Sequence, residues 1–257
     1  MKNYYMKKII LFLLVAQFYC SCAQENEIVP FMENYYGELK LPSEISEMEY
    51  TFETRDENYE QRYKYINIKN IDILEGILHQ ESNGENSTIE VNGNDVKYYI
   101  NHVKVQGIED DESEPMRENM KFRLQTYQTL LFAPNYIKEN SKYFNYVGND
   151  TLHDLGELLV YSCSKWPDKL RFSDNEIIKF YFKEDGQLVS IKETDSEGKG
   201  IAFYMIGHKI YNGNKLPELT SIFTLDAQGK RSKRIEQQTY DFGHNFFESG
   251  PSNFNKF

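Results

Sequence analysis

The C-terminal third of the chain consists of runs in which apolar and polar residues alternate, separated by turn sequences. In one run Ile178, Phe180 and Phe182 alternate with Lys179 and Lys183. The turn sequences are Glu184–Gln187, Asp195–Gly200, Asn212–Pro217 and Asp226–Lys230. This arrangement is typical of an antiparallel meander, in which Pro217 is expected to begin its strand. We expect one face of the sheet to be apolar and the other to carry lysine, glutamate, serine and threonine.

The first half of the chain continues the same pattern. Apolar residues alternate with polar ones from Met48 to Glu53, and residues 63–68 and 71–78 are rich in tyrosine and isoleucine, which favour strands. Between Ile89 and Ile100 two alternating runs flank Asn92-Gly93-Asn94. Either dipeptide of this triplet predicts a tight hairpin.

Two segments have helical rather than strand periodicity. One begins after the N-terminal apolar run and places Ile28, Met32 and Leu39 on one side. The other follows the acidic stretch 109–114 and carries an apolar stripe made of Met116, Met120, Leu124, Tyr127 and Leu131. The sequence therefore predicts an α+β fold, mostly antiparallel β. We expect a curved sheet or incomplete β-barrel with an N-terminal helix and a mid-chain helical insertion against its concave face.

The N-terminus has the organisation of an export signal. Residues 1–8 contain three lysines and no acid, and residues 9–19 are apolar except for Gln17. A membrane-spanning helix needs roughly 20 apolar residues, so this run is too short to be a stable anchor. We predict that the protein is exported.

Two cleavage sites remain possible. Ser21 and Ala23 suit ordinary signal peptidase cutting before Gln24, whereas Ser21-Cys22 resembles a bacterial lipobox, in which cleavage precedes a cysteine that is then lipidated. Residues 1–23 are therefore predicted to be a signal peptide, with cleavage before Cys22 or Gln24, and residues 24–257 a single half-barrel-like domain. Lipidation of Cys22 would attach the domain to a membrane. The protein would then be a periplasmic or outer-membrane lipoprotein of the cell envelope, and otherwise secreted and soluble.

Charge argues against nucleic acid as a partner. Loss of residues 1–23 changes the formal net charge from −11 to −14, because three lysines and no acid are removed. Phosphate binding requires clustered lysine and arginine, and the basic group at 230–234 is isolated.

The sequence offers no catalytic or metal-binding constellation. Its five histidines stand far apart, without the spacing of a zinc site, and the glycines lie at turns rather than in a phosphate loop. Cys163 lies in an apolar strand and is expected to be a small buried hydrophobe. We expect a protein that is not an enzyme and carries no cofactor or metal.

A series of short motifs resembles one protein family. The motifs are Phe132–Tyr136, Tyr146–Leu152, Gly156–Tyr161, Phe180–Leu188 and Asn212–Pro217. In this order, over about residues 115 to 245, they resemble the LolA-like secreted proteins of Bacteroidetes, which are relatives of periplasmic lipoprotein carriers. The resemblance implies an incomplete antiparallel barrel with helices packed into its open side around an apolar cavity. Carriers of this fold hold the acyl chains of lipoproteins or lipids.

Two functional hypotheses follow. The first is a membrane-anchored protein that binds a lipid or lipoprotein acyl chain, with Met116, Met120, Leu124, Tyr127 and Leu131 as ligand-binding residues. The same stripe is also typical of an ordinary core. The second is a non-catalytic envelope protein that recognises a glycan or protein partner through some of its 20 tyrosines and 17 phenylalanines.

The lipid anchor is directly testable. Metabolic labelling with a fatty-acid analogue should mark the exported protein, and Cys22→Ala should abolish the label because the acceptor thiol is gone. Labelling that persists in the variant, or none in the parent protein, would instead indicate cleavage after Ala23.

Overall fold

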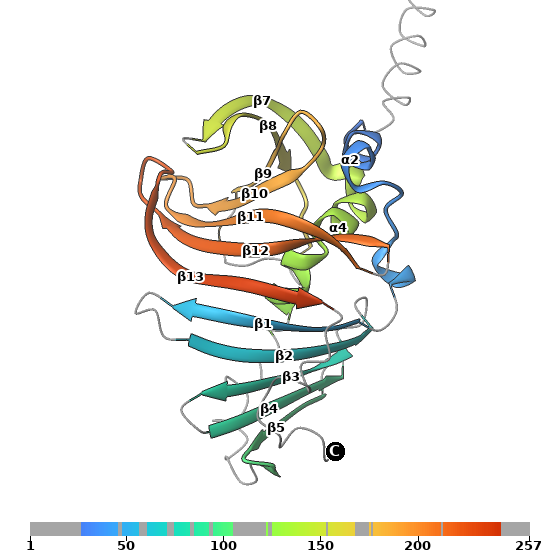
Figure 1. The fold of residues 1–257 in the computed structure, drawn as a ribbon. Coiled ribbons are helices and arrows are strands. Elements are labelled where there is room, and N and C mark those ends of the chain that lie inside the picture. Colours follow the sequence, from blue (N-terminus) through green and yellow to red (C-terminus); the bar gives the residue numbers. More distant parts are fainter. Residues whose placement is uncertain are drawn as a thin grey trace, which may run out of the picture.

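The computed structural model describes residues 27–45, 48–56, 61–70, 75–82, 85–92, 95–104, 122, 125–152, 154–167, 175, 177–211 and 213–242. The strands of this part of the chain form a single curved antiparallel sheet of thirteen strands, with short helices on one side (Figure 1). The sheet is open, with β6 at one edge and β7 at the other. The predicted fold class is confirmed.

The elements alternate between long stretches of strand and two brief helical segments. The helices are α2 (Ile28–Tyr36) and α4 (Ala133–Glu139), residues 125–131 are also helical, and η1 (Pro42–Glu44) and η2 (Ser141–Tyr143) are 3-10 turns. The strands are β1 (Met48–Asp56), β2 (Gln61–Asn70), β3 (Glu75–Ser82), β4 (Glu85–Asn92), β5 (Asp95–Ile100), β6 (Val103–Lys104), β7 (Phe144–Leu152), β8 (Gly156–Cys163), β9 (Ile177–Phe182), β10 (Leu188–Thr194), β11 (Gly200–Tyr211), β12 (Asn214–Leu225) and β13 (Arg231–Phe242).

Two meanders meet in the middle of the sheet. Each strand from β1 to β6 pairs with its neighbour in sequence, and so does each strand from β7 to β13. The two series are joined where β1 pairs with β13, from Tyr50 opposite Phe242 to Asp56 opposite Glu236. A single continuous sheet results.

The helices cover one face of the β7–β13 half, called here the helix-covered face. Its strands contribute Phe180, Phe182 and Phe203, each at most 2% exposed. Ile28 and Met32 of α2 and Ile137 of α4 complete the same hydrophobic core and are fully buried. The helices that the sequence predicted therefore pack on the sheet through their apolar sides.

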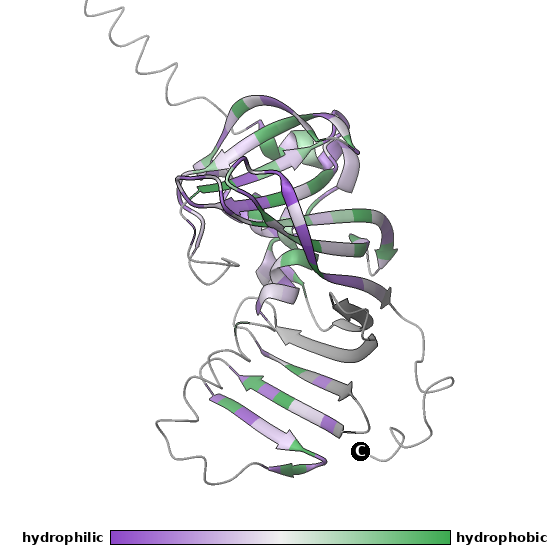
Figure 2. Cartoon of the chain, turned by 90° about the vertical axis from the view of Figure 1, so that its left-hand side faces the viewer, coloured by the Kyte–Doolittle hydropathy of each residue, from purple (hydrophilic) through white to green (hydrophobic). Residues whose placement is uncertain are grey.

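The opposite face is not the polar surface that the alternation predicted. Leu158, Tyr181, Val189 and Tyr204 are buried there in a second hydrophobic cluster. Leu152 and Leu158 belong to the β7–β8 hairpin, which folds over this face. In Figure 2 apolar and polar residues still alternate along many strands, so the sequence pattern alone does not reveal the second cluster.

An ion pair shows how strongly the sheet curls. Asp154, in the turn between β7 and β8, pairs with Arg231 at the start of β13. In a flat sheet β8 and β13 are five strand spacings apart, about 24 Å. The Arg231 guanidinium also lies 5.0 Å from the ring centre of Tyr204. The β7–β8 hairpin curls over this face and buries Lys192. The Lys192 ammonium lies 4.8 Å from the centre of the Tyr181 ring.

The tight turns mostly lie where the sequence predicted them. Asn92 pairs with Asp95, so β4 and β5 are joined by a two-residue loop. At the β11–β12 turn the prediction was wrong about Pro217, which lies inside β12 opposite His208 rather than at its start. The pairing of β12 with β13 begins only at Leu219. Pro217 therefore has a strand on one side only, where a missing N–H is tolerated.

Gly186 lets α2 approach the β9–β10 turn. Its φ of +90° lies in the left-handed region, and a Cβ at this position would lie 2.1 Å from the carbonyl oxygen of Phe31 in α2. A side chain here would push the helix away from the sheet. The turn itself is closed by a bond from the Lys183 N–H to the Gln187 carbonyl, 2.9 Å long.

We expect Gly186→Ala to lower the free energy of unfolding much more than Gly213→Ala. Gly213 has a similar φ of +76°, but a Cβ added there would have no atom within 4 Å, so its substitution costs only the backbone strain, about 1–2 kcal/mol. The clash at Gly186 adds roughly 1–3 kcal/mol. Urea denaturation of both variants measures the difference. Equal losses would show that α2 does not depend on this close contact.

Candidate functional site

The candidate site is the layer between the helices and the helix-covered face of the sheet. Tyr127 and Leu131, two of the predicted ligand-binding residues, lie here and are 5% and 0% exposed. Met116, Met120 and Leu124 lie outside the described residues. The ligand-binding role of the stripe therefore stays a prediction. Its two described members, Tyr127 and Leu131, are packed in the core.

Residues 127–137 are all buried, although they form only a helical turn or two on either side of Phe132. Phe132, Ala133 and Ile137 are fully buried, and α4 presents no described exposed apolar side chain. Pro134 near the start of α4 is tolerated because a first-turn N–H needs no helical partner. This segment fills the layer with apolar side chains.

The helical segments are tied to each other by polar bonds. The Lys138 ammonium of α4 pairs with the Glu33 carboxylate of α2 at 3.2 Å and donates to the Leu39 carbonyl at 2.5 Å. Asn135 donates its amide N–H to the Lys40 carbonyl at 2.9 Å. Side chains of α4 therefore bind the chain segment that follows α2. The bonded residues are about a hundred positions apart in the sequence.

The contact of α2 with the sheet is mainly aromatic. The ring of Phe31 lies 5.8 Å from that of Phe182 and 6.1 Å from that of Tyr161, measured between centroids. Edge-on and offset ring pairs of this kind add to the gain from burial. The Tyr36 hydroxyl supplies a polar contact by accepting the Leu188 N–H at 3.2 Å.

His208 of β11 joins this contact. Its Nε2 lies 3.4 Å from the Tyr36 hydroxyl, and its Nδ1 lies 3.1 Å from the amide nitrogen of Gln187. Beside it, the Lys215 ammonium lies 3.5 Å from the centre of the Tyr35 ring and donates to the Tyr35 carbonyl at 2.8 Å. Sequence reasoning missed this cluster, because nothing near His208 in the sequence marks Tyr36 as its partner.

Burial controls the ionisation of the cluster. Desolvation lowers the pKa of His208 to about 4, and the charges of Lys215 and Lys183 act in the same direction. Desolvation also raises the pKa of Tyr36 far above its ordinary value. The imidazole and the phenol are both neutral near pH 7, which suits a hydrogen-bonded pair in an apolar layer.

Two buried polar atoms in the helical segment have no hydrogen-bond partner among the described residues. The amide nitrogen of Gln128 and the hydroxyl of Thr129 are buried, each in a residue that is 1% exposed, and neither makes a hydrogen bond with the part of the chain that the structure describes. A buried polar group without a partner costs about 1–3 kcal/mol. Ordered water or a ligand with a polar group would satisfy such atoms.

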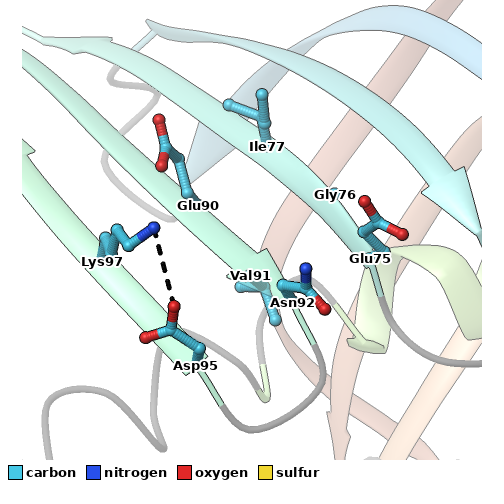
Figure 3. A pocket seen from close by; sticks show the side chains of 8 residues that line it. All are labelled: Glu75, Gly76, Ile77, Glu90, Val91, Asn92, Asp95 and Lys97. Atoms are coloured by element: carbon cyan, nitrogen blue, oxygen red, sulfur yellow. Dashed lines mark ion pairs between the residues drawn. The ribbon is translucent and has the colours of Figure 1, made fainter.

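A separate depression lies on β3, β4 and β5, with a volume of about 220 Å³ (Figure 3). Its rim includes Glu75, Glu90, Asp95 and Lys97, and Lys97 pairs with Asp95 at 3.6 Å. The depression is smaller than typical ligand pockets of 300–1,000 Å³, roughly, and it is open and polar. Within the described ranges, no group of three or more histidine, cysteine or acidic side chains is arranged to hold a metal ion.

Cys163 is half-buried at the end of β8, and burial raises the pKa of its thiol to about 11. A thiol with this pKa is a poor nucleophile at neutral pH. In the part of the chain that the structure describes, no helix is long and apolar enough to cross a membrane.

No family model and no curated protein matches the sequence. Among solved structures, the chain is similar to a LolA superfamily protein from Nitrosomonas europaea, at 9% identity, with 84% of this chain and 90% of that chain covered and a TM-score of 0.47. It is also similar to an outer membrane lipoprotein-sorting protein domain from Vibrio parahaemolyticus, at 9% identity, with 90% and 96% covered and a TM-score of 0.44. A DUF1329 family protein from Desulfovibrio piger gives 9% identity, 88% and 96% coverage and a TM-score of 0.44.

All three similarities are distant. At this identity and these scores nothing about ligands is transferred from them. The more specific resemblance to Bacteroidetes proteins is still a prediction.

We expect Thr129→Val to raise the free energy of unfolding of ligand-free protein by about 1 kcal/mol, because a methyl group replaces a buried hydroxyl that has no partner. Thr126→Val is the matched control in the same helical segment. The Thr126 hydroxyl already donates to the Phe122 carbonyl at 2.8 Å in an exposed position, so its loss should change stability little. Urea denaturation compares the two. A loss of stability in Thr129→Val would show that the hydroxyl has a partner, such as bound water.

Proposed function

We propose that the protein binds a lipid or lipoprotein acyl chain in the cell envelope, between the helical cover and the helix-covered face of the sheet. The supporting observation is the way in which α2 and α4 are attached. Polar bonds join them to each other, whereas most of their contact with the sheet is made by rings and aliphatic side chains. The polar bonds described between α2 and the sheet are confined to the end of the helix, at Tyr35 and Tyr36. A cover built in this way can separate from the sheet without breaking its internal polar bonds.

The exposed apolar surface that results would suit an acyl chain. Phe180 and Phe182 of β9, Ile191 of β10 and Phe203 of β11 would form an apolar surface once the cover is displaced. Apolar surface of this kind gains about 25 cal/mol per Å² on contact with another apolar group. Met116, Met120 and Leu124 would line the ligand together with Tyr127 and Leu131.

The buried polar atoms of Gln128 and Thr129, which have no partner within the described ranges, favour an amphipathic ligand over a pure hydrocarbon. An ester, amide or carboxylate next to the acyl chain can accept from the Gln128 amide and the Thr129 hydroxyl. The proposal includes no catalytic step.

Lipidation of Cys22 belongs to the same proposal. Cys22 lies five residues before Glu27, where the described structure begins. Five extended residues reach about 17 Å, so a lipid on Cys22 would keep α2 near the membrane surface. An anchored protein of this kind would receive or hold acyl chains at a membrane rather than shuttle between two membranes.

One observation favours the alternative role of an envelope interaction protein. β7 lies at an edge of the sheet, and its Tyr146 and Val147 are 52% and 53% exposed. An extended segment of a partner protein can add to such an edge through backbone hydrogen bonds. This role needs no apolar ligand.

Native mass spectrometry of protein purified from an exporting cell tests the proposal. We expect acyl species to co-purify, and an added fatty acid to raise the melting temperature of stripped protein by mass action. Leu124→Gln should reduce the bound lipid, while Thr126→Gln, at a half-exposed position of the same segment, should not.

A single apo mass together with no effect of fatty acid on melting would contradict lipid binding and favour the partner-protein role. A large loss of stability in Leu124→Gln, on the order of 2–4 kcal/mol with lipid content unchanged, would show that the stripe is core rather than cavity wall.

A further inference from the structure

His208 occupies a contact made by three separate segments of the chain. It faces Tyr35 and Tyr36 at the end of α2, and its ring is edge-on to both, at 5.4 Å and 5.7 Å between centroids. Gln187, at the end of the β9–β10 turn, meets its other nitrogen. The imidazole therefore connects α2, the β9–β10 turn and β11.

The hydrogen bonds fit a neutral imidazole. The Gln187 amide N–H donates to Nδ1, so the single ring proton lies on Nε2 and faces the Tyr36 oxygen. That oxygen also accepts the Leu188 N–H. A second proton, on Nδ1, would face the N–H of Gln187, which places two donors against each other.

The surrounding charges do not compensate a protonated ring. Lys215 of β12 and Lys183 of the β9–β10 turn lie nearby, opposed by Asp185 of that turn and Glu218 of β12. Glu218 already pairs with Lys209 of β11 at 3.2 Å. From α2 the ring meets only the neutral phenols of Tyr35 and Tyr36.

We propose that His208 is an acid-sensitive latch, which holds α2 against the sheet when the imidazole is neutral and releases it when the imidazole is protonated. Release breaks the bond to Tyr36, whose hydroxyl also serves the Leu188 amide. Because α4 is bonded to Glu33, Leu39 and Lys40, release of α2 loosens the whole cover. The release of an acyl ligand would follow from this loosening, and that extension rests on the proposed function.

The sign follows from proton linkage. A released imidazole takes up a proton near pH 6.5, whereas the latched one does so only near pH 4, where its pKa lies. Over this interval protons bind the released state preferentially and favour it. Between pH 7 and pH 4 this linkage increases the released population about 100-fold.

Hydrogen exchange of the full mature protein tests the latch. After correction for the intrinsic pH dependence, amides of α2 should lose protection by about 100-fold more than those of β10 and β11 between pH 7 and pH 4. His208→Gln, which stays neutral, should remove this selective loss. His79→Gln is the matched control, since His79 is a half-buried histidine on β3 bonded to Thr88, and it should retain the loss.

Lys215→Met provides a second variant if His208→Gln does not fold. Removal of the nearest cation brings the pKa of His208 closer to its ordinary value, so the acid effect should become smaller even though α2 is held more weakly at every pH. An acid effect of unchanged size in His208→Gln or in Lys215→Met, or no α2-selective loss in the parent protein, would overturn the latch.

Discharge of a ligand is measured separately, with a fluorescent fatty acid bound at pH 7 and followed after a shift to pH 4. Release in the parent but not in His208→Gln supports the extension to ligand discharge. Selective loss of α2 protection without any binding of the fatty acid would leave the latch in place and contradict the proposed function alone.

Discussion

The pairing of β1 with β13 is the contact on which the sheet depends. It joins residues 50–56 to residues 236–242, nearly the whole described length apart. Without it the molecule would have two sheets and two additional open edges, which are prone to pair with other chains. Loop-closure entropy grows only with the logarithm of loop length, so this distant pairing costs little extra stability. Contacts between residues so far apart in sequence are expected to slow folding, because the long loop between them has to close before the strands can pair.

Local features were predictable from the sequence and distant ones were not. The β4–β5 turn and the hairpins between β9 and β13 depend on residues a few positions apart, and glycine with alternation specifies them. The burial of Lys192 depends on the β7–β8 hairpin, which folds over it from another part of the chain. A lysine in an alternating strand indicates a solvent-facing position unless that distant cover is known. The same limit hid His208, whose partner Tyr36 lies 172 residues away.

The predicted helical stripe illustrates an ambiguity that periodicity cannot remove. Tyr127 and Leu131 are buried, as both a core stripe and a cavity wall require. Gln128 and Thr129 between them are buried too, although alternation around a helix would place them toward solvent. A helical segment that is buried on all sides, polar residues included, lies between other layers of structure. Its polar atoms then need partners from outside the helix, which is the physical ground for placing a polar ligand group or water there.

The role of α2 follows from a defect in the sheet beneath it. The pairing of β9 with β10 shifts register between Leu188 and Ser190, and next to this shift the Leu188 amide donates to the Tyr36 hydroxyl. Without α2 that amide would be buried and unpaired, or open to water. The helix therefore supplies a hydrogen-bond acceptor to the sheet next to the irregular pairing. Because the Tyr36 oxygen contacts both the Leu188 amide and His208, the attachment of α2 is coupled to the protonation state of a single imidazole.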